Sequence, residues 1–273
     1  MKRIMLALCL TLFAAAPALA HFQMIHTPDI ALNEGQALDL KLVFTHPFEA
    51  GHTMDMAPMQ EFYVVSQRGE AAEPQKTDLM EYLEKITWTS LTNSGVAYEA
   101  KLPKKIVRSM GDYVFVAVPG PYLEEEEGIY IQQITKVVAN VGGVPGNWAE
   151  PVGLPTEIVP LDKPYANWTG GVFRGVVLSD GKPVANADLE VEYLNHPPVE
   201  GKNEFQKEAV AEAPHDAFVT MGIKTNDRGE FTVGIPHAGW WGVCALGTGP
   251  QTEYEGKELS QDAVIWFKAV DMK

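Results

Sequence analysis

Cysteine is almost absent from this sequence, which contains only Cys9 and Cys244 among 273 residues. Cys9 falls within an apolar N-terminal stretch that we expect to be removed, so the mature chain has one thiol and no intramolecular disulfide. Cys244 lies in the apolar run 243–246, which favours packing as a small hydrophobe over nucleophilic chemistry. Stability must therefore come from packed hydrophobic cores.

Long apolar runs are missing after the N-terminus. A basic start is followed by the apolar stretch 4–15 and by the A-x-A-like sequence at 18–20. This is the pattern of a Sec-type signal peptide comprising residues 1–20. No later run approaches the roughly 18 apolar residues that a spanning helix needs. The sequence predicts a periplasmic protein that begins at His21 and has no stable membrane insertion.

Basic residues are outnumbered, with 21 Lys and Arg against 36 Asp and Glu. The predicted signal peptide holds two of the basic residues and no acid, so the mature charge is 19 minus 36, or −17. Such a surface repels nucleic acid and anionic lipid and concentrates cations nearby. We expect no nucleic-acid partner. Solubility of an exported protein is an alternative reason for the acidity.

Familiar catalytic motifs are missing too. The sequence contains no G-x-S-x-G, no P-loop, no G-x-G-x-x-G, no H-E-x-x-H and no C-x-x-C. No pair of carboxylates is singled out for sugar hydrolysis. We therefore expect a protein that is not an enzyme.

Short segments of alternating apolar and polar residues, separated by turn residues, run through the mature chain. This pattern predicts an all-β protein with two β-sandwich domains of immunoglobulin-like or transthyretin-like type. We expect an N-terminal metal-binding sandwich over 21–164, closed by the strand 156–161, and a C-terminal sandwich over 165–273. One or two helical turns are expected at 77–83. The expected strands are 22–26, 37–44, 61–66, 86–90, 96–102, 112–118, 129–141, 156–161, 171–179, 187–194, 230–235, 239–245 and 262–268.

The segment 45–59 concentrates side chains that bind metals: two imidazoles, two carboxylates and three thioethers. Imidazole suits late first-row divalent ions, whereas thioether is softer and favours copper(I). These residues are His46, His52, Glu49, Asp55, Met54, Met56 and Met59.

His46 and His52 are six positions apart, which on a straight strand would separate them by about 20 Å. Pro47 ends strand pairing and Gly51 permits a tight bend, so a loop could bring both rings to one ion. His21, at the predicted mature N-terminus, offers its α-amine as well as its ring. We predict a metal site formed by His21, His46 and His52, with Glu49, Met54 or Asp55 as a further contact.

Substitution of these ligands is expected to leave stability nearly unchanged, because a loop and a terminus contribute little to a core. The run 124–127 of four glutamates is expected to be a solvated loop. The remaining histidines are weaker candidates. His26 shares a predicted strand face with Phe22 and Met24, His196 and His215 lie beside prolines, and His237 is expected to pack against indole.

Nine segments spread over the mature chain carry a family resemblance. They are HFQMIHTP (21–28), KLVFTHPFEAGHTMDM (41–56), ITWTSLTNSG (86–95), YIQQITKVV (130–138), TEIVPL (156–161), FRGVV with DGKPV (173–184), EVEYLNH (190–196), GIPHAGWWG (234–242) and ELSQDAVIWF (258–267). The chain resembles the NikK-like periplasmic components that accompany energy-coupling-factor (ECF) nickel transporters, within a wider exported family linked to nickel and cobalt uptake. The second half also resembles carboxypeptidase-regulatory-like sandwiches.

The resemblance implies capture of Ni²⁺, or alternatively Co²⁺, outside the inner membrane and delivery to inner-membrane transporter components. It places the ligand role on His21, His46 and His52. Copper handling is an alternative, because an N-terminal histidine with another histidine also resembles the histidine brace of periplasmic copper carriers. Cu²⁺ should win in vitro whatever the physiological metal. Two further alternatives are a copper enzyme acting on polysaccharide and an adhesion or scaffold module without stoichiometric metal.

Overall fold

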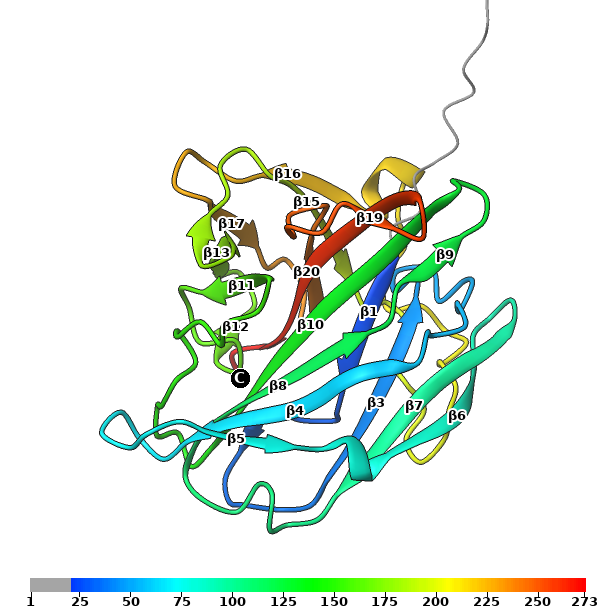
Figure 1. Cartoon of the computed structure of the whole chain (residues 1–273). Coiled ribbons are helices and arrows are strands. Elements are labelled where there is room, and N and C mark those ends of the chain that lie inside the picture. Colours follow the sequence, from blue (N-terminus) through cyan, green and yellow to red (C-terminus); the bar gives the residue numbers. More distant parts are fainter. Residues whose placement is uncertain (1–20) are drawn as a thin grey trace, which may run out of the picture.

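The structure, a computed structural model, describes residues 21–273, and the expected signal peptide at 1–20 lies outside them. Within this range the chain is all-β, and its only helical segments are two short 3-10 turns, η1 (Met80–Tyr82) and η2 (Asp216–Phe218) (Figure 1). The strands up to the predicted domain boundary are β1 (Phe22–His26), β2 (Ala31–Leu32), β3 (Leu38–Thr45), β4 (Met59–Gln67), β5 (Gln75–Asp78), β6 (Leu83–Thr89), β7 (Ser94–Leu102), β8 (Gly111–Pro119), β9 (Tyr122–Glu124), β10 (Ile129–Val141) and β11 (Thr156–Pro160). Those after it are β12 (Asn167–Trp168), β13 (Val172–Ser179), β14 (Lys182–Pro183), β15 (Asp188–Tyr193), β16 (Met221–Lys224), β17 (Glu230–Gly234), β18 (Gly239–Ala245), β19 (Glu253–Tyr254) and β20 (Lys257–Val270).

The all-β class and every expected strand are confirmed, with ends shifted by a few residues. The helical turns expected at 77–83 shrink to η1, because the flanking residues extend into β5 and β6. The strands that were not expected are short, and β5 is an exposed polar strand without apolar alternation. Asp180 and Gly181 have φ values of 46° and 71° and form the tight turn between β13 and β14, as the Asp-Gly pair predicts.

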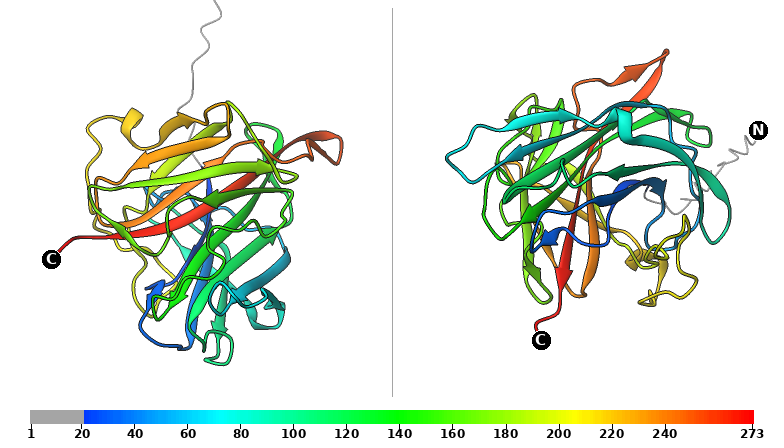
Figure 2. Two further views of the ribbon diagram at one scale, coloured as in Figure 1. Left: turned by 90° about the vertical axis from the view of Figure 1, so that its left-hand side faces the viewer. Right: turned by 90° about the horizontal axis from the view of Figure 1, so that it is seen from below.

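Three sheets build the molecule. The N-terminal sheet has the order β1-β3-β7-β6, and the C-terminal sheet is β11-β13-β14 with β17 paired to β13. Between them lies the central sheet, whose main path is β16-β15-β18-β20-β10-β8-β4-β5. The long strands β10 and β20 run parallel through its middle and connect the two halves of the chain (Figures 1 and 2).

The central sheet faces a different core on each side. Along β20, Val264 and Trp266 belong to the first core, while Ile265 and Phe267 belong to the second. Because successive side chains of a strand point to opposite faces, β20 serves both cores at once. The two β-sandwiches are therefore fused through a shared layer.

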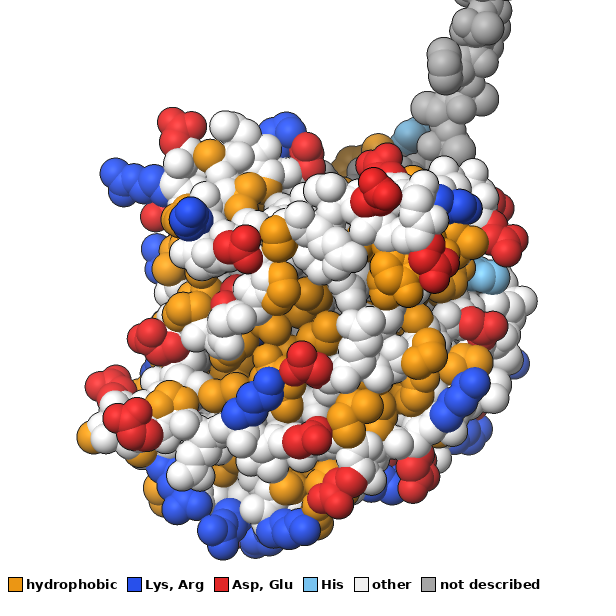
Figure 3. All heavy atoms as spheres, viewed as in Figure 1, with side chains coloured by type: hydrophobic (Ala, Val, Ile, Leu, Met, Phe, Trp, Pro, Cys, Tyr) orange, Lys and Arg blue, Asp and Glu red, His pale blue; other side chains and the backbone are white. Residues whose placement is uncertain are grey.

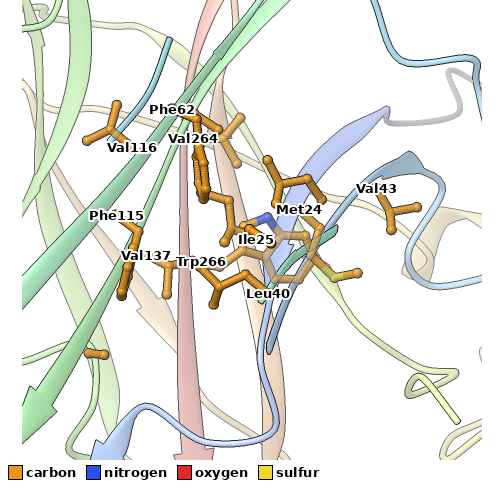
Figure 4. Packing of buried hydrophobic residues seen from close by; sticks show 14 of the residues in the cluster. Met24, Ile25, Leu40, Val43, Phe62, Phe115, Val116, Val137, Val264 and Trp266 are labelled. Carbon is orange, nitrogen blue, oxygen red and sulfur yellow. The ribbon is translucent and has the colours of Figure 1, made fainter. Parts of the chain in front are cut away.

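The first core fills the space between the N-terminal and central sheets (Figure 4). Met24 and Leu40 from the N-terminal sheet meet Phe62, Phe115 and Trp266 from the central sheet (Figure 4). The indole Nε1–H of Trp266 also donates to the carbonyl oxygen of Gln23 at 2.9 Å. This bond ties β1, where the predicted metal site begins, to the last long strand.

The second core is smaller and lies under the C-terminal sheet. Phe173 stacks on Phe267 with ring centroids 4.0 Å apart. Gly175 is required here, since a Cβ atom at that position would lie 2.7 Å from the ring of Phe231. Close packing thus fixes the C-terminal sheet on the far face of the central sheet.

Segments from each side of the expected boundary at 164/165 pack against segments from the other side. The strand expected to close the first domain, β11, pairs with β13 and places Ile158 in the second core. In the other direction, the loop 195–220 returns to the N-terminal sheet, where Phe205 packs edge-on against Trp88 at 5.1 Å. The division at 164/165 stays a prediction, and no extended linker separates the two halves.

Hydrophobic and charged side chains are distributed unevenly over the surface. On the face viewed in Figure 1, hydrophobic side chains gather over the middle strands and charged side chains surround them (Figure 3). Nowhere in residues 21–273 is there a helix of the length and apolarity needed to cross a membrane.

Candidate metal site

The loop between β3 and β4 begins with a narrow reversal of the chain. Thr45, the last residue of β3, forms an isolated antiparallel bridge with Thr53, and the Met54 N–H donates to the Phe44 carbonyl at 2.9 Å. His46 and His52 are the next residues inward from the bridged pair. The loop therefore brings together two histidines that a straight strand would hold about 20 Å apart.

The tight conformation lies one residue earlier than the sequence suggests. Ala50 has a φ of 43°, in the left-handed region, whereas Gly51 does not. Ala50 is fully buried, and its carbonyl accepts the Leu91 N–H at 2.9 Å. A neighbouring loop thus holds this strained backbone in place.

His21 joins His46 through strand register. Phe22 in β1 pairs with Thr45 in β3, so His21 and His46 are the next opposed positions of the antiparallel ladder. Their ring centroids are 4.6 Å apart, with 59° between the planes. His52 is close enough for its charge to lower the pKa of both rings. The structure thus brings the three predicted ligands together at one end of the N-terminal sheet.

Burial keeps two of these imidazoles uncharged. His46 is 5% exposed, and burial, followed by the charges of His21 and His52, lowers its pKa to about 4. Burial also lowers the pKa of His21, outweighing the carboxylates of Glu124 and Glu127 that act in the opposite direction. His52 is exposed. His21 is half-buried, with 17% of its side chain exposed. A metal needs a neutral imidazole, and the lowered pKa favours that form of both rings at neutral pH.

Glu124 joins the site although its sequence context did not predict it. It ends β9, is 12% exposed, and lies 3.1 Å from Nε2 of His21 through its Oε2 atom. The run 124–127 was expected to be a solvated loop, and this is wrong for Glu124, because β9 pairs antiparallel with β10 and turns the carboxylate inward. Two features of the sequence pointed to such a hairpin. They are Gly128, directly after the glutamates, and the predicted strand 129–141 that follows it.

A cleft of about 240 Å³ lies beside His21. Its acidic lining residues are Glu127, Glu190 and Asp262, and no Lys or Arg lines it. Burial, followed by the charges of Asp262 and Glu127, raises the pKa of Glu190 to about 7. Burial also raises the pKa of Asp262. A cation bound near the histidines would favour the ionised forms of these acids, so the cleft suits a cation better than an anion.

The other possible metal ligands, Glu49, Met54 and Asp55, are less well placed to reach an ion bound by the histidines. Met54 is 1% exposed within the first core. Asp55 accepts the Val96 N–H at 2.6 Å and so holds the loop against β7. Glu49 is exposed. Within residues 21–273, no group of three or more His, Cys, Asp or Glu side chains is already spaced to hold a metal ion.

The other histidines lie elsewhere. His26 packs on Trp240 with ring centroids 5.4 Å apart, and Nδ1 of His196 lies 3.0 Å from the Gln206 carbonyl. His215 accepts the Ala217 N–H at the start of η2. The ring of His237 packs against Tyr193 with ring centroids 5.4 Å apart, and its carbonyl accepts the expected indole contact from the Trp241 Nε1–H at 3.0 Å. These remaining histidines do not join the site.

The fold defines an all-β protein of fused sandwiches, and comparison with known proteins places it in a family. The family model described as "Domain of unknown function (DUF4198)" matches residues 18–249, and the chain belongs to this family. No curated protein matches the sequence.

Solved structures resemble the chain only distantly. The D0-D1 domain of Intimin is 10% identical, with 91% of this chain and 100% of that chain covered and a TM-score of 0.21. The adhesin InvE of Yersinia pseudotuberculosis is 13% identical, with 90% and 58% covered and a TM-score of 0.24. Similarity at this level carries no functional argument.

Proposed function

We propose that the protein is an exported, non-catalytic metal-binding protein that captures Ni²⁺ as cargo and delivers it to an inner-membrane uptake transporter. The observation that carries the proposal is the convergence of His21, His46 and His52 from two strands and a loop. The buried ring of His46 and the half-buried ring of His21 have lowered pKa values, which favour the uncharged form at neutral pH. The acidic cleft beside them would raise the local concentration of a divalent cation.

The contact between Glu124 and His21 supports a particular mode of binding. If Nε2–H of His21 donates to Glu124, then Nδ1 carries the free lone pair. In a chain that begins at His21, Nδ1 and the α-amine can form a six-membered chelate. Carboxylates that fix the tautomer of a ligating histidine in this way are a common feature of metal sites.

The histidines would have different roles in capture and release of the ion. His46 is buried and His21 half-buried, and the exposed ring of His52 can turn toward the ion and away again. Nickel is favoured over copper(I), because the thioethers of Met54 and Met56 are part of the first core. Co²⁺ and Cu²⁺ should also bind, since nitrogen ligands accept each of these ions and Cu²⁺ binds most tightly.

Calorimetry with Ni²⁺ tests this proposal on two forms of the mature chain. One form begins at His21, and the other carries one additional residue before it, which keeps the ring and removes the amine chelate. We expect the extended form, His46→Ala and His52→Ala each to bind Ni²⁺ at least about tenfold more weakly. His237→Ala is the matched control, an exposed histidine outside the site that should leave the affinity unchanged.

Equal affinity of the two forms would exclude the α-amine as a ligand. Absence of stoichiometric Ni²⁺ in every form would reject the proposal and favour the adhesion or scaffold alternative. Glu124→Gln adds a separate measurement. We expect it to weaken binding about tenfold, since it disturbs the tautomer of His21 without removing a ligand.

A further inference from the structure

The first strand of the described chain, β1, is an edge strand of the N-terminal sheet. Among the strands of residues 21–273 it pairs with β3 alone. Its other side faces the central sheet, where it lies against β10 and β20 (Figure 1). Backbone groups on that side have no strand partner, and buried ones need another hydrogen-bond partner. Side chains of the central sheet provide it.

Gln133 of β10 binds two of these backbone groups. Its Nε2–H donates to the His21 carbonyl at 2.7 Å, and its Oε1 accepts the Gln23 N–H at 2.7 Å. The second bond fixes which end of the amide is the oxygen, because an N–H group needs an acceptor. The Gln23 carbonyl is held in turn by the Trp266 indole N–H at 2.9 Å. The backbone on both sides of Phe22 is therefore anchored to the central sheet.

The Gln133 amide is itself held in place. It is 3% exposed, and its Nε2 lies 3.3 Å from Oδ2 of Asp262, the residue directly opposite it in the β10–β20 pairing. Asp262 is 1% exposed and accepts the Gly247 N–H at 2.8 Å and the Ser260 hydroxyl at 2.6 Å. A buried network whose polar groups are all bonded favours a single geometry. Gln133 therefore offers the His21 carbonyl a rigid donor.

The position of His21 depends on this bond. A residue at the start of an edge strand frays unless it is tied down. The carbonyl that Gln133 holds belongs to the same residue as the ring that lies 4.6 Å, centroid to centroid, from the ring of His46. We propose that Gln133 is a positioning residue of the metal site, which keeps the ring and the α-amine of His21 beside His46 for binding of the ion. This inference rests on the proposed function.

Gln133→Met tests the proposal in the mature chain that begins at His21. Methionine keeps the length of the side chain and removes both bonds to β1. We expect Ni²⁺ to bind about tenfold more weakly in calorimetry, as is usual when a group that orients a metal ligand is removed.

Gln132→Met is the matched control. Gln132 is the neighbouring residue of β10, is 5% exposed, and points to the opposite face of the sheet. Its amide donates to the Pro119 carbonyl at 2.8 Å, so the substitution also removes a buried hydrogen bond. It should leave the Ni²⁺ affinity unchanged.

The start of the chain separates positioning from a general loss of structure. The form with one additional residue before His21 lacks the amine chelate, so Gln133→Met should weaken its Ni²⁺ binding by only about threefold or less. A general destabilisation would weaken both forms by the same factor. Metal-free NMR adds a measurement that does not depend on affinity. A nuclear Overhauser effect between the rings of His21 and His46 is expected in the native chain and in Gln132→Met, and it should be lost in Gln133→Met.

The results distinguish this inference from the proposed function. Equal Ni²⁺ affinity of Gln133→Met and the native chain would overturn the inference and leave the proposed function standing. So would an equal loss in Gln132→Met, or a contact between the rings of His21 and His46 that survives in Gln133→Met. Absence of Ni²⁺ binding by the native chain would instead reject the proposed function, and the positioning role with it. Gln133→Leu, which also removes both bonds, provides the same test where Gln133→Met does not fold.

Discussion

Burial of His26 and His46 makes this fold sensitive to acid. Burial lowers the pKa of His26 to about 3 and that of His46 to about 4, from an ordinary value of 6.5. Below pH 6.5 these two histidines therefore bind protons in the unfolded chain, whereas in the native state they stay neutral. This contribution to stability is present above pH 6.5 and is lost as the pH falls through 4 to 3. We expect the urea midpoint to drop progressively as the pH falls from 6.5 to 3, and less steeply in His26→Gln, with exposed His215→Gln as the control.

Glu192 acts in the opposite direction at higher pH. Burial raises its pKa to about 8, although its carboxylate accepts hydrogen bonds from Thr220 and from the Phe48 N–H at 3.1 Å. Because the folded pKa is raised, this contribution to stability is complete below pH 4.5 and is lost as the pH rises through 8. Glu192→Gln should therefore reduce the loss of stability between pH 6 and 9, by about 1–3 kcal/mol. An unchanged pH profile in denaturant unfolding would contradict this.

His46 and His52 should differ in stability as well as in metal binding. The sequence suggested that substitution at either position would leave stability unchanged, but His46 is 5% exposed and its ring packs against that of His21 at a tilt of 59°. We expect His46→Ala to lower the metal-free unfolding free energy by about 1–2 kcal/mol and the exposed His52→Ala by less than about 0.5 kcal/mol. Chemical denaturation in the presence of a chelator measures both. Equal losses would mean that burial of the His46 ring contributes nothing.

At the scale of elements, one ion pair joins β10 to β11. Lys136 and Glu157 are each 2% exposed and lie 2.6 Å apart, and Glu157 also accepts the N–H groups of Val152 and Gly153. Lys136→Met leaves a buried carboxylate without its cation, so we expect a loss of about 3–5 kcal/mol. The double variant Lys136→Met/Glu157→Gln should recover part of that loss in urea unfolding. A single variant as stable as the native chain would show that the pair is not desolvated.

The strands could be predicted because alternation and turn residues are local properties. The 13-residue strand β10 was predicted to the residue from its β-branched run. What could not be predicted is which elements pair. The pairing of β11 with β13 and the inward turn of Glu124 depend on contacts between segments whose local sequence is compatible with several neighbours. The loop at His46 was predicted from Pro47, whereas its left-handed residue, Ala50, was not.

At the scale of the whole molecule, the sequence indicated two sandwiches and did not reveal that they share a sheet. The pairing of β10 with β20 joins residues more than 120 positions apart, such as Tyr130 and Leu259. One local signal was present. The run 263–267 is continuously apolar, as is typical of a strand that is buried on both faces.

The shared sheet makes a prediction about truncation at the expected boundary. A chain of residues 21–164 lacks β20, which pairs with β10 and supplies the fully buried Trp266 to the first core. It also exposes one edge of β10, and an unpaired central strand promotes aggregation. We expect this fragment to give no near-UV circular dichroism and no dispersed NMR spectrum. The full mature chain should instead unfold in one transition, with coincident curves from fluorescence and far-UV circular dichroism. A folded, monomeric 21–164 fragment would show that the first sandwich is complete without β20, and that the boundary read from the sequence divides two independent domains.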